Sequence, residues 1–293
     1  MAYHLHSEEL DVRIADPGED YKGARFDWSG LVTQVTWRKT GMTFCGVENE
    51  TPGQGSGGIG ICNEFGIEEA LGYSDAAVGG RFPKLGIGLL QKLDEDPYFF
   101  MLHYPIKPFM IHREGDERSV RFTVEPEEVN GYACRLEKTL TLEGAKLSIA
   151  YRLTNTGGQP IETDEYVHNF LRIGSYEAGP DYTLTWGGAV EVESPEVGNR
   201  ADLKLDEKQI TWTGRPEGEF YSKLTVPTID SPFTWELRHV PSGAYVRESG
   251  DFPIDRVAMW GHAAVISPEV FIRLSLQPGE TVAWTRTYEF FAE

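Results

Sequence analysis

The sequence has few cysteines, and they lie far apart. Cys45, Cys62 and Cys134 are the only three among 293 residues, and no two of them form a Cys-x-x-Cys pair. A small set of odd number without regular spacing excludes a disulfide framework as the organising principle of the fold. The stability of this chain must therefore come from an ordinary packed core.

Basic residues are also scarce. The chain has 27 Lys and Arg against 46 Asp and Glu, so the formal net charge is 27 − 46 = −19. A surface of this sign repels a phosphate backbone, and no segment supplies a compensating basic stripe. We therefore exclude nucleic acid as a partner.

Long hydrophobic runs are missing as well. The apolar stretches are broken after a handful of residues by Gly, Pro or a charged residue, and none reaches the length that crosses a bilayer. The first ten residues lack the basic start and apolar run of a signal peptide. The sequence thus predicts a cytoplasmic protein that does not bind a membrane.

Helical periodicity is hard to find, whereas alternation with a period of two recurs along the chain. Apolar residues alternate with polar ones from Leu140 to Leu142 and from Leu147 to Leu153, on either side of the turn 143–146. This pattern is typical of a hairpin with one buried face. Further strands are predicted at Ser119 to Val124, Tyr182 to Trp186, Gln209 to Trp212, Phe233 to Arg238 and Thr281 to Phe290.

Strands without helices to cover them must pack sheet against sheet. We therefore predict an all-β fold, a large antiparallel β-sandwich. The composition does not shift anywhere in a way that marks a linker, and no repeat of fixed period occurs. The sequence predicts a single domain over residues 1–293.

The segment from Ile161 to Ile173 is the most informative for function. In a strand, Asp164, Tyr166 and His168 share one face with Glu162, Phe170 and Arg172. Two carboxylates, an imidazole and a guanidinium make a poor core, because each buried charge needs a partner. We expect the opposite face to be buried and the polar face to line a concave surface open to water, suited to a sugar. A solvated, ion-paired strand is an equally good interpretation of this segment alone.

The sequence contains three informative short motifs: His168-Asn169-Phe170, Gly80-Arg81-Phe82 and Leu276-Gln277-Pro278-Gly279-Glu280. Together they resemble segments of the aldose 1-epimerase (galactose mutarotase) superfamily. The triplet His168-Asn169-Phe170 is similar to the strand that carries the general acid of the superfamily. The segment beginning Gly80-Arg81-Phe82 resembles its substrate-binding arginine segment, and Leu276-Gln277-Pro278-Gly279-Glu280 resembles its last turn. The resemblance implies a galactose mutarotase-like β-supersandwich and anomer interconversion of a free hexose or related sugar.

The resemblance also assigns roles to residues. It implies His168 as the acid, the C-terminal carboxylate Glu269 as the base, and Arg81 as a ligand of sugar hydroxyls. His103 lies in about the region of a second histidine of the superfamily. Asp164 and Tyr166, from the strand itself, are the remaining substrate-binding candidates. Proton transfer on opposite sides of the ring opens it to the aldehyde without a cofactor, so the two groups are expected to lie several ångströms apart.

The sequence departs from the superfamily pattern at one position that matters for catalysis. The glutamate that precedes a proline in the superfamily falls on Ser267, ahead of Pro268, and Glu269 follows two positions later. A serine is no base of comparable strength. A carbohydrate-binding β-sandwich without catalysis is therefore an alternative function.

Two further alternatives remain open. A hexose-6-phosphate 1-epimerase would need a cationic pocket, for which Arg81, Lys84 and Lys107 are the candidates. A glycoside hydrolase would use paired carboxylates such as Glu162, Asp164 and Glu269. The histidines are interpreted as scattered, so neither a metal site nor a cofactor is predicted. The expected partner is a small-molecule sugar, and the protein is expected to be a monomer or a homodimer.

Overall fold

The structure is a computed structural model that describes residues 2–51, 54–187, 191–197, 203–206, 208–225 and 233–293. Every strand pairing within these ranges is antiparallel, and none of these residues lies in a helix. Accordingly, they hold no helix with the length and apolar character needed to span a membrane. The predicted all-β fold is confirmed.

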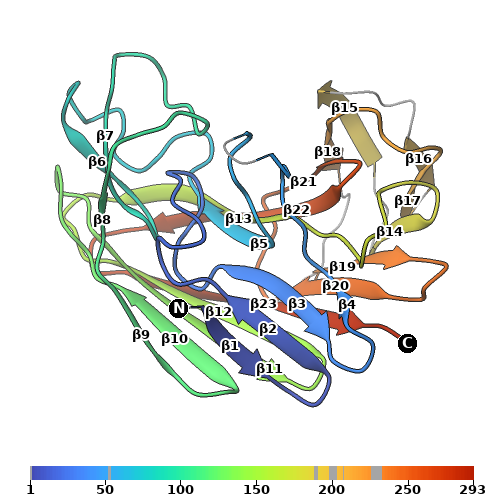
Figure 1. Cartoon of the computed structure of the whole chain (residues 1–293). Helices are drawn as coiled ribbons and strands as arrows, with labels where there is room; N and C mark the ends of the chain where they lie inside the picture. The colour runs from blue at the N-terminus through green and yellow to red at the C-terminus, as the bar shows by residue number, and fades with distance from the viewer. Residues whose placement is uncertain (1, 52–53, 188–190, 198–202, 207, 226–232) are drawn as a thin grey trace.

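Two ten-stranded sheets make up most of the molecule (Figure 1). The first sheet has the order β1-β2-β3-β5-β13-β22-β21-β18-β15, with β4 paired to β3. Its strands are β1 (Tyr3–His6), β2 (Leu10–Ile14), β3 (Val32–Trp37), β4 (Met42–Thr43), β5 (Ile61–Phe65), β13 (Ile161–Asn169), β15 (Glu191–Val197), β18 (Phe220–Thr225), β21 (Arg256–His262) and β22 (Val265–Leu276).

The second sheet has the order β16-β17-β14-β19-β20-β23-β12-β11-β10-β9. Its strands are β9 (Ile111–Gly115), β10 (Ser119–Val124), β11 (Cys134–Glu143), β12 (Lys146–Asn155), β14 (Tyr182–Trp186), β16 (Leu203–Asp206), β17 (Gln209–Trp212), β19 (Phe233–His239), β20 (Tyr245–Gly250) and β23 (Thr281–Phe291). A small third sheet contains β6 (Arg81–Lys84), β7 (Gly88–Gln91) and β8 (Ile106–Pro108).

The strands predicted from alternation are present with nearly the same bounds. The hairpin predicted around 143–146 is formed by β11 and β12, with Glu143 paired to Lys146 across a two-residue turn. Gly144 begins this turn with a φ of 58°, which a residue without a Cβ adopts at little cost. The other five predicted strands are β10, β14, β17, β19 and β23.

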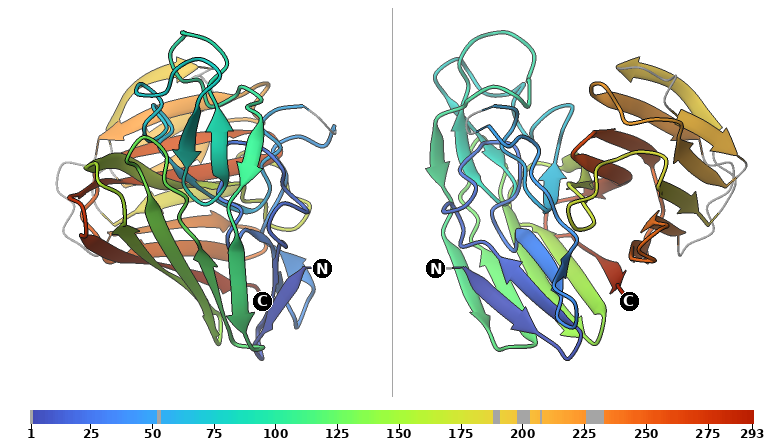
Figure 2. Two further views of the ribbon diagram at one scale, coloured as in Figure 1. Left: turned by 90° about the vertical axis from the view of Figure 1, so that its left-hand side faces the viewer. Right: turned by 45° about the vertical axis from the view of Figure 1, so that its right-hand side comes forward.

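Both large sheets take strands from the two halves of the chain. In the first sheet, β5 from the first half of the chain lies next to β13, β22 and β21 from the second half. Figures 1 and 2 show these four strands between the small third sheet on one side and the β15–β18 end on the other. The prediction of a single domain over residues 1–293 stays a prediction.

The core between the two large sheets is apolar, with a buried charge network inside it. Arg286 is fully buried and donates to Glu165 (Nη2 to Oε2, 2.8 Å) and to Glu248 (Nη1 to Oε1, 2.7 Å). Breaking such a buried network by removing one partner typically costs about 3–5 kcal/mol. The inward face of β13, which carries Glu165 and Val167, is thus fixed against the second sheet.

Candidate functional site

The register of β13 and β22 brings His168 and Glu269 face to face. The two strands pair from Ile161 with Leu276 to Glu165 with Ile272, and the bridge between Leu171 and Ile266 continues the same register. In this register residue 168 lies opposite residue 269. His168 Nε2 and Glu269 Oε1 are 3.4 Å apart. Two residues that are 101 positions apart in the sequence therefore meet on one face of the sheet.

The segment Ser267-Pro268-Glu269 is held against β13 by side chains. Proline has no N–H to donate to a sheet ladder. The Asn169 backbone N–H donates to Ser267 Oγ (2.9 Å), and Asn169 Nδ2 donates to the Pro268 carbonyl (2.7 Å). Ser267 Oγ in turn donates to Glu269 Oε1 (3.1 Å). Ser267 thus orients the neighbouring carboxyl group in this chain.

Aromatic rings surround the imidazole. The His168 ring stacks on Phe170 with centroids 4.2 Å apart, and Trp260 contacts it edge-on at 4.9 Å. Phe26 packs on it edge-on at 5.9 Å. His168 is only 4% exposed and Glu269 only 3%. His168 Nδ1 is buried without a hydrogen-bond partner among the described residues, so the imidazole has little solvation to stabilise a charge.

Burial changes the protonation of both groups. Desolvation, aided by the nearby positive charge of Arg25, holds the pKa of His168 well below 6.5. Desolvation raises the pKa of Glu269 to about 8, against the opposing effect of Arg25. At pH 7 the contact is therefore a neutral imidazole beside a protonated carboxyl group rather than an ion pair. One acid and one base in contact are the groups that general acid–base catalysis requires.

A second buried cluster lies next to this pair and was not predicted. Arg25 Nε donates to Glu64 Oε2 (2.8 Å), and Arg25 Nη2 donates to the hydroxyl of Tyr166 (2.9 Å). The Tyr166 hydroxyl donates to the same Glu64 oxygen (2.6 Å). Lys84 Nζ lies 3.5 Å from the other oxygen of Glu64. Glu64 is opposite Tyr166 in the register of β5 and β13, so the cluster shares the face of His168.

Arg25 is the functional candidate that sequence reasoning missed. The chain contains two Arg-Phe pairs that follow a small residue, Arg25-Phe26 and Arg81-Phe82. The resemblance selected the second pair. In the structure Arg81 is exposed on β6, whereas Arg25 is buried within hydrogen-bond distance of Tyr166. An Arg-Phe pair after a small residue was the signal available in the sequence, but only burial distinguishes Arg25 from Arg81.

The predicted site residues therefore separate into two groups. The structure brings together His168, Glu269 and Tyr166, whereas His103 is exposed in the loop between β7 and β8. Asp164 is buried on the His168 face and pairs with Arg256 (Oδ2 to Nη2, 2.6 Å). Four of the predicted site residues therefore lie on the His168 face: Asp164, Tyr166, His168 and Glu269.

Two expectations about this face are wrong. The face was expected to be open to water, but Tyr166 is 0% exposed. Arg25 bonds to its hydroxyl and Phe271 stacks on its ring, while Phe26 packs on His168 beside it. The acid and base were expected several ångströms apart, but they are in contact. Both oxygens that exchange protons in ring opening are bonded to the same sugar carbon, so the wider separation is not required by the chemistry. The opposite face, with Val167, is buried as predicted.

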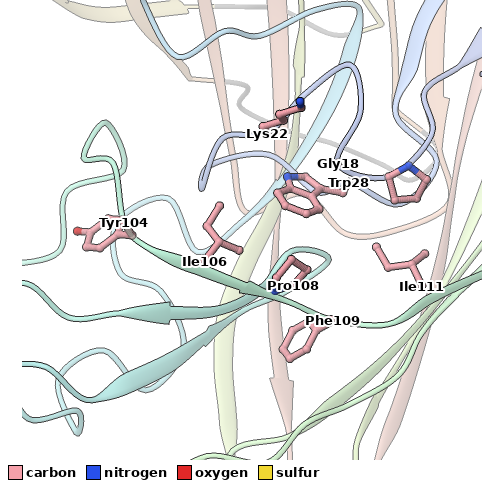
Figure 3. Close-up of a pocket in the computed structure, with 9 residues that line it drawn as sticks. Gly18, Lys22, Trp28, Tyr104, Ile106, Pro108, Phe109 and Ile111 are labelled. Atoms are coloured by element: carbon pink, nitrogen blue, oxygen red, sulfur yellow. The ribbon is translucent and has the colours of Figure 1, made fainter.

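Neither of two cavities formed by the described residues includes His168 or Glu269 in its wall. One, of 660 Å³, is lined by Trp28, Lys22, Tyr104 and the β8 residues Ile106 and Pro108 (Figure 3). Most of the side chains that line this cavity are apolar.

The other cavity, of 500 Å³, is lined by polar groups. Asp164, Glu162, Arg273 and Tyr132 contribute to its wall. Both volumes fall in the range of small-molecule sites.

The alternative of a phosphorylated sugar needs a cationic pocket, and its three candidate residues do not form one. Arg81 is exposed, and Lys107 pairs with Glu127 on the surface. Lys84 is buried against Glu64 and donates to the Phe65 carbonyl (2.6 Å). This arrangement provides no phosphate pocket from the candidates named.

Comparisons with known proteins identify the fold. No protein-family profile matches the sequence, and no curated protein matches it. Among solved structures, a galactose mutarotase related enzyme from Lactobacillus acidophilus is similar with a TM-score of 0.63 and 11% identity, over 99% of this chain and 97% of that one.

Two more solved structures agree with it. A galactose mutarotase-like protein from Lactobacillus casei gives a TM-score of 0.60 at 12% identity, over 99% and 100% of the two chains. A candidate aldose 1-epimerase from Escherichia coli K12 gives 0.61 at 13% identity, over 100% and 99%. The chain therefore has the galactose mutarotase-like fold, as its motifs predicted.

Proposed function

We propose that the protein is an aldose 1-epimerase-like enzyme that interconverts the anomers of an uncharged sugar with His168 and Glu269. The observation that carries the proposal is the buried contact of 3.4 Å between the imidazole of His168 and the carboxyl group of Glu269. The structural neighbours, which are named as mutarotase-like or epimerase-like proteins, support the same class of reaction.

The pair can open a sugar ring without a cofactor. In the resting state the carboxyl group of Glu269 gives its proton to the ring oxygen, while His168 Nε2 takes the proton of the C1 hydroxyl. The bond from C1 to the ring oxygen breaks, the aldehyde rotates about the C1–C2 bond, and the ring closes on its other face. These resting roles are the reverse of those implied by the resemblance, and the two groups exchange them when the ring closes.

The proposal requires a path to the buried pair. Trp260 contacts the imidazole and is partly exposed, whereas Phe170 and Phe26 are fully buried. Displacement of the Trp260 side chain would let a sugar ring stack where the indole now lies, with the Arg25 and Glu64 cluster beside it. A saccharide suits such a wall because its C–H faces contact aromatic rings while its hydroxyls bond to charged groups.

Polarimetry of freshly dissolved α-glucose and α-galactose tests the proposal. We expect anomerisation faster than in buffer, and a loss of about 10²- to 10⁴-fold in rate for His168→Gln and Glu269→Gln, the usual contribution of general acid–base groups. Glu143→Gln is the matched control, since Glu143 is an exposed carboxylate at the end of β11 and lines neither cavity. Rates equal to buffer across several aldoses would refute the catalytic proposal.

Sugar binding without turnover is the second candidate. The observation that favours it is the 500 Å³ cavity, whose wall of Asp164, Glu162, Arg273 and Tyr132 could bond sugar hydroxyls away from the His168 pair. Calorimetry against a sugar panel separates the two functions. Binding that is weakened by Arg273→Ala but not by Glu269→Gln, with no anomerisation, would support this cavity as the binding site.

A further inference from the structure

The first hairpin of the molecule gathers two histidines and an aspartate on one face. In β1 the side chain of Leu5 is fully buried, so its neighbours His4 and His6 point to the opposite, outer face. The register of β1 and β2 pairs His6 directly with Asp11. Residues opposite each other in an antiparallel pair share a face, so all three side chains lie on the outside of the hairpin.

The three side chains converge on one point. His4 Nδ1 is 3.2 Å from Asp11 Oδ1, and His6 Nδ1 is 3.2 Å from Asp11 Oδ2. The two imidazoles are parallel, with centroids 5.9 Å apart and an interplanar angle of 14°. The ligand atoms of all three residues lie within 4.8 Å of one another. Ligands bonded to a tetrahedral zinc ion at 2.0–2.1 Å are about 3.3–3.4 Å apart, close to the 3.2 Å between each imidazole nitrogen and an oxygen of Asp11.

We propose that His4, His6 and Asp11 form a binding site for a divalent transition-metal ion of the zinc type. Two imidazole nitrogens and one carboxylate suit Zn²⁺, Cu²⁺ or Ni²⁺ and are a poor set for Mg²⁺ or Ca²⁺, which prefer oxygen ligands. Three protein ligands leave a fourth position for water. The net charge of −19 favours the approach of a cation to this surface.

The surroundings of the three residues are compatible with an ion. Their side chains are 38–44% exposed, so an ion can reach them from solvent. The nearest strand partner of His4 is Arg13. The Arg13 guanidinium is directed to Asp20 (3.1 Å) and to the Thr33 hydroxyl (2.7 Å). Its positive charge is thus compensated by Asp20.

The site is separate from the His168 pair. β1 is at the edge of the first sheet, four strands from β13, which at about 4.8 Å per strand is roughly 19 Å. An ion there would join the edge strand β1 to β2 and stabilise the N-terminal hairpin by mass action. The proposal does not depend on the function of the protein.

Calorimetric titration of the full chain with ZnCl₂ at pH 7.5 tests the proposal. We expect one equivalent to bind, and a rise in melting temperature with zinc. His6→Gln and Asp11→Asn should each raise the Kd more than about tenfold, since even loss of an outer-shell partner costs about 10- to 100-fold. His112→Gln is the control, because His112 is exposed on β9 outside the cluster, and its Kd should equal that of the wild type.

A second variant and a spectroscopic readout keep the test decisive if one substitution disturbs the hairpin. His4→Gln should weaken zinc binding to the same extent, with an unchanged circular dichroism spectrum. Electron paramagnetic resonance of bound Cu²⁺ should show coupling to two nitrogens in the wild type and to one in His4→Gln. Equal zinc affinity in His6→Gln and His112→Gln, or no saturable binding to the wild type, would overturn the proposal.

Discussion

Replacing Glu269 by Gln should change the pH dependence of stability in a direction that the structure fixes. In the folded protein the pKa of Glu269 is raised to about 8 from its ordinary value of 4.5. Between these two values the folded state holds a proton that the unfolded state has lost, so the wild type loses stability as the pH rises. The contribution is fully present below about pH 4.5 and is gone above about pH 8.

The magnitude follows from the size of the shift. A displacement of 8 − 4.5 = 3.5 pH units corresponds to about 5 kcal/mol at 1.36 kcal/mol per unit. Gln has no proton to lose, and its carbonyl oxygen can still accept from Ser267 Oγ. The stability of Glu269→Gln minus that of the wild type should therefore rise by several kcal/mol between pH 5 and pH 9. Other buried acids, such as Glu165 and Glu248, are common to both proteins and cancel in the difference.

Urea denaturation followed by tryptophan fluorescence, at intervals between pH 5 and pH 9, measures this difference. Glu162→Gln is the control, since the Glu162 side chain is 54% exposed, and its difference from the wild type should be flat. A flat difference for Glu269→Gln as well would mean that the buried carboxyl group ionises normally. In that case the neutral acid–base pair, and the resting proton assignment built on it, would be wrong.

Two further outcomes follow from other buried groups. Arg25→Ala removes the partner of the buried Glu64 and should lower the free energy of unfolding by about 3–5 kcal/mol. Arg81→Ala, at the exposed arginine, should change it by less than about 0.5 kcal/mol. Equal effects of the two substitutions in urea denaturation would contradict the assignment of Arg25. Burial raises the pKa of Cys45 and of Cys134 to about 12 and also raises that of Cys62. A disulfide reagent at pH 8 should therefore label no thiol in the native protein and three thiols in guanidinium chloride. Rapid labelling of the native protein would contradict the burial of these cysteines.

Local pattern was enough to predict the strands and the fold class. Alternation with a period of two located the β11–β12 hairpin and its turn. One face of each strand is buried, and a strand buried on one face has an apolar residue at every second position. The charged residues on one face of β13 pointed to its other face, which carries Val167, as the buried one. The resemblance of short motifs added the galactose mutarotase-like arrangement of the sheets.

The candidate site was predicted only in part. The resemblance, not the residue pattern, selected His168 and Glu269 as a pair. Their contact follows from the register of β13 and β22, which the local residue pattern does not specify for strands 101 residues apart. The spacing of His4 and His6 places both side chains on one face of a strand. The prediction of no metal site did not take this spacing into account. The third member of that cluster, Asp11, is brought opposite His6 by the turn between β1 and β2.

The sequence by itself determined which residues form strands, which face of each strand is apolar, and which chemistry-bearing side chains share the outer face of β13. Only the tertiary structure decided what covers that face. Arg25 and Phe26 come from a segment remote from β13, and they pack on Tyr166 and His168 respectively. Burial depends on which segments pack together, and the local residue pattern does not encode this long-range property. Burial in turn sets the protonation of His168 and Glu269.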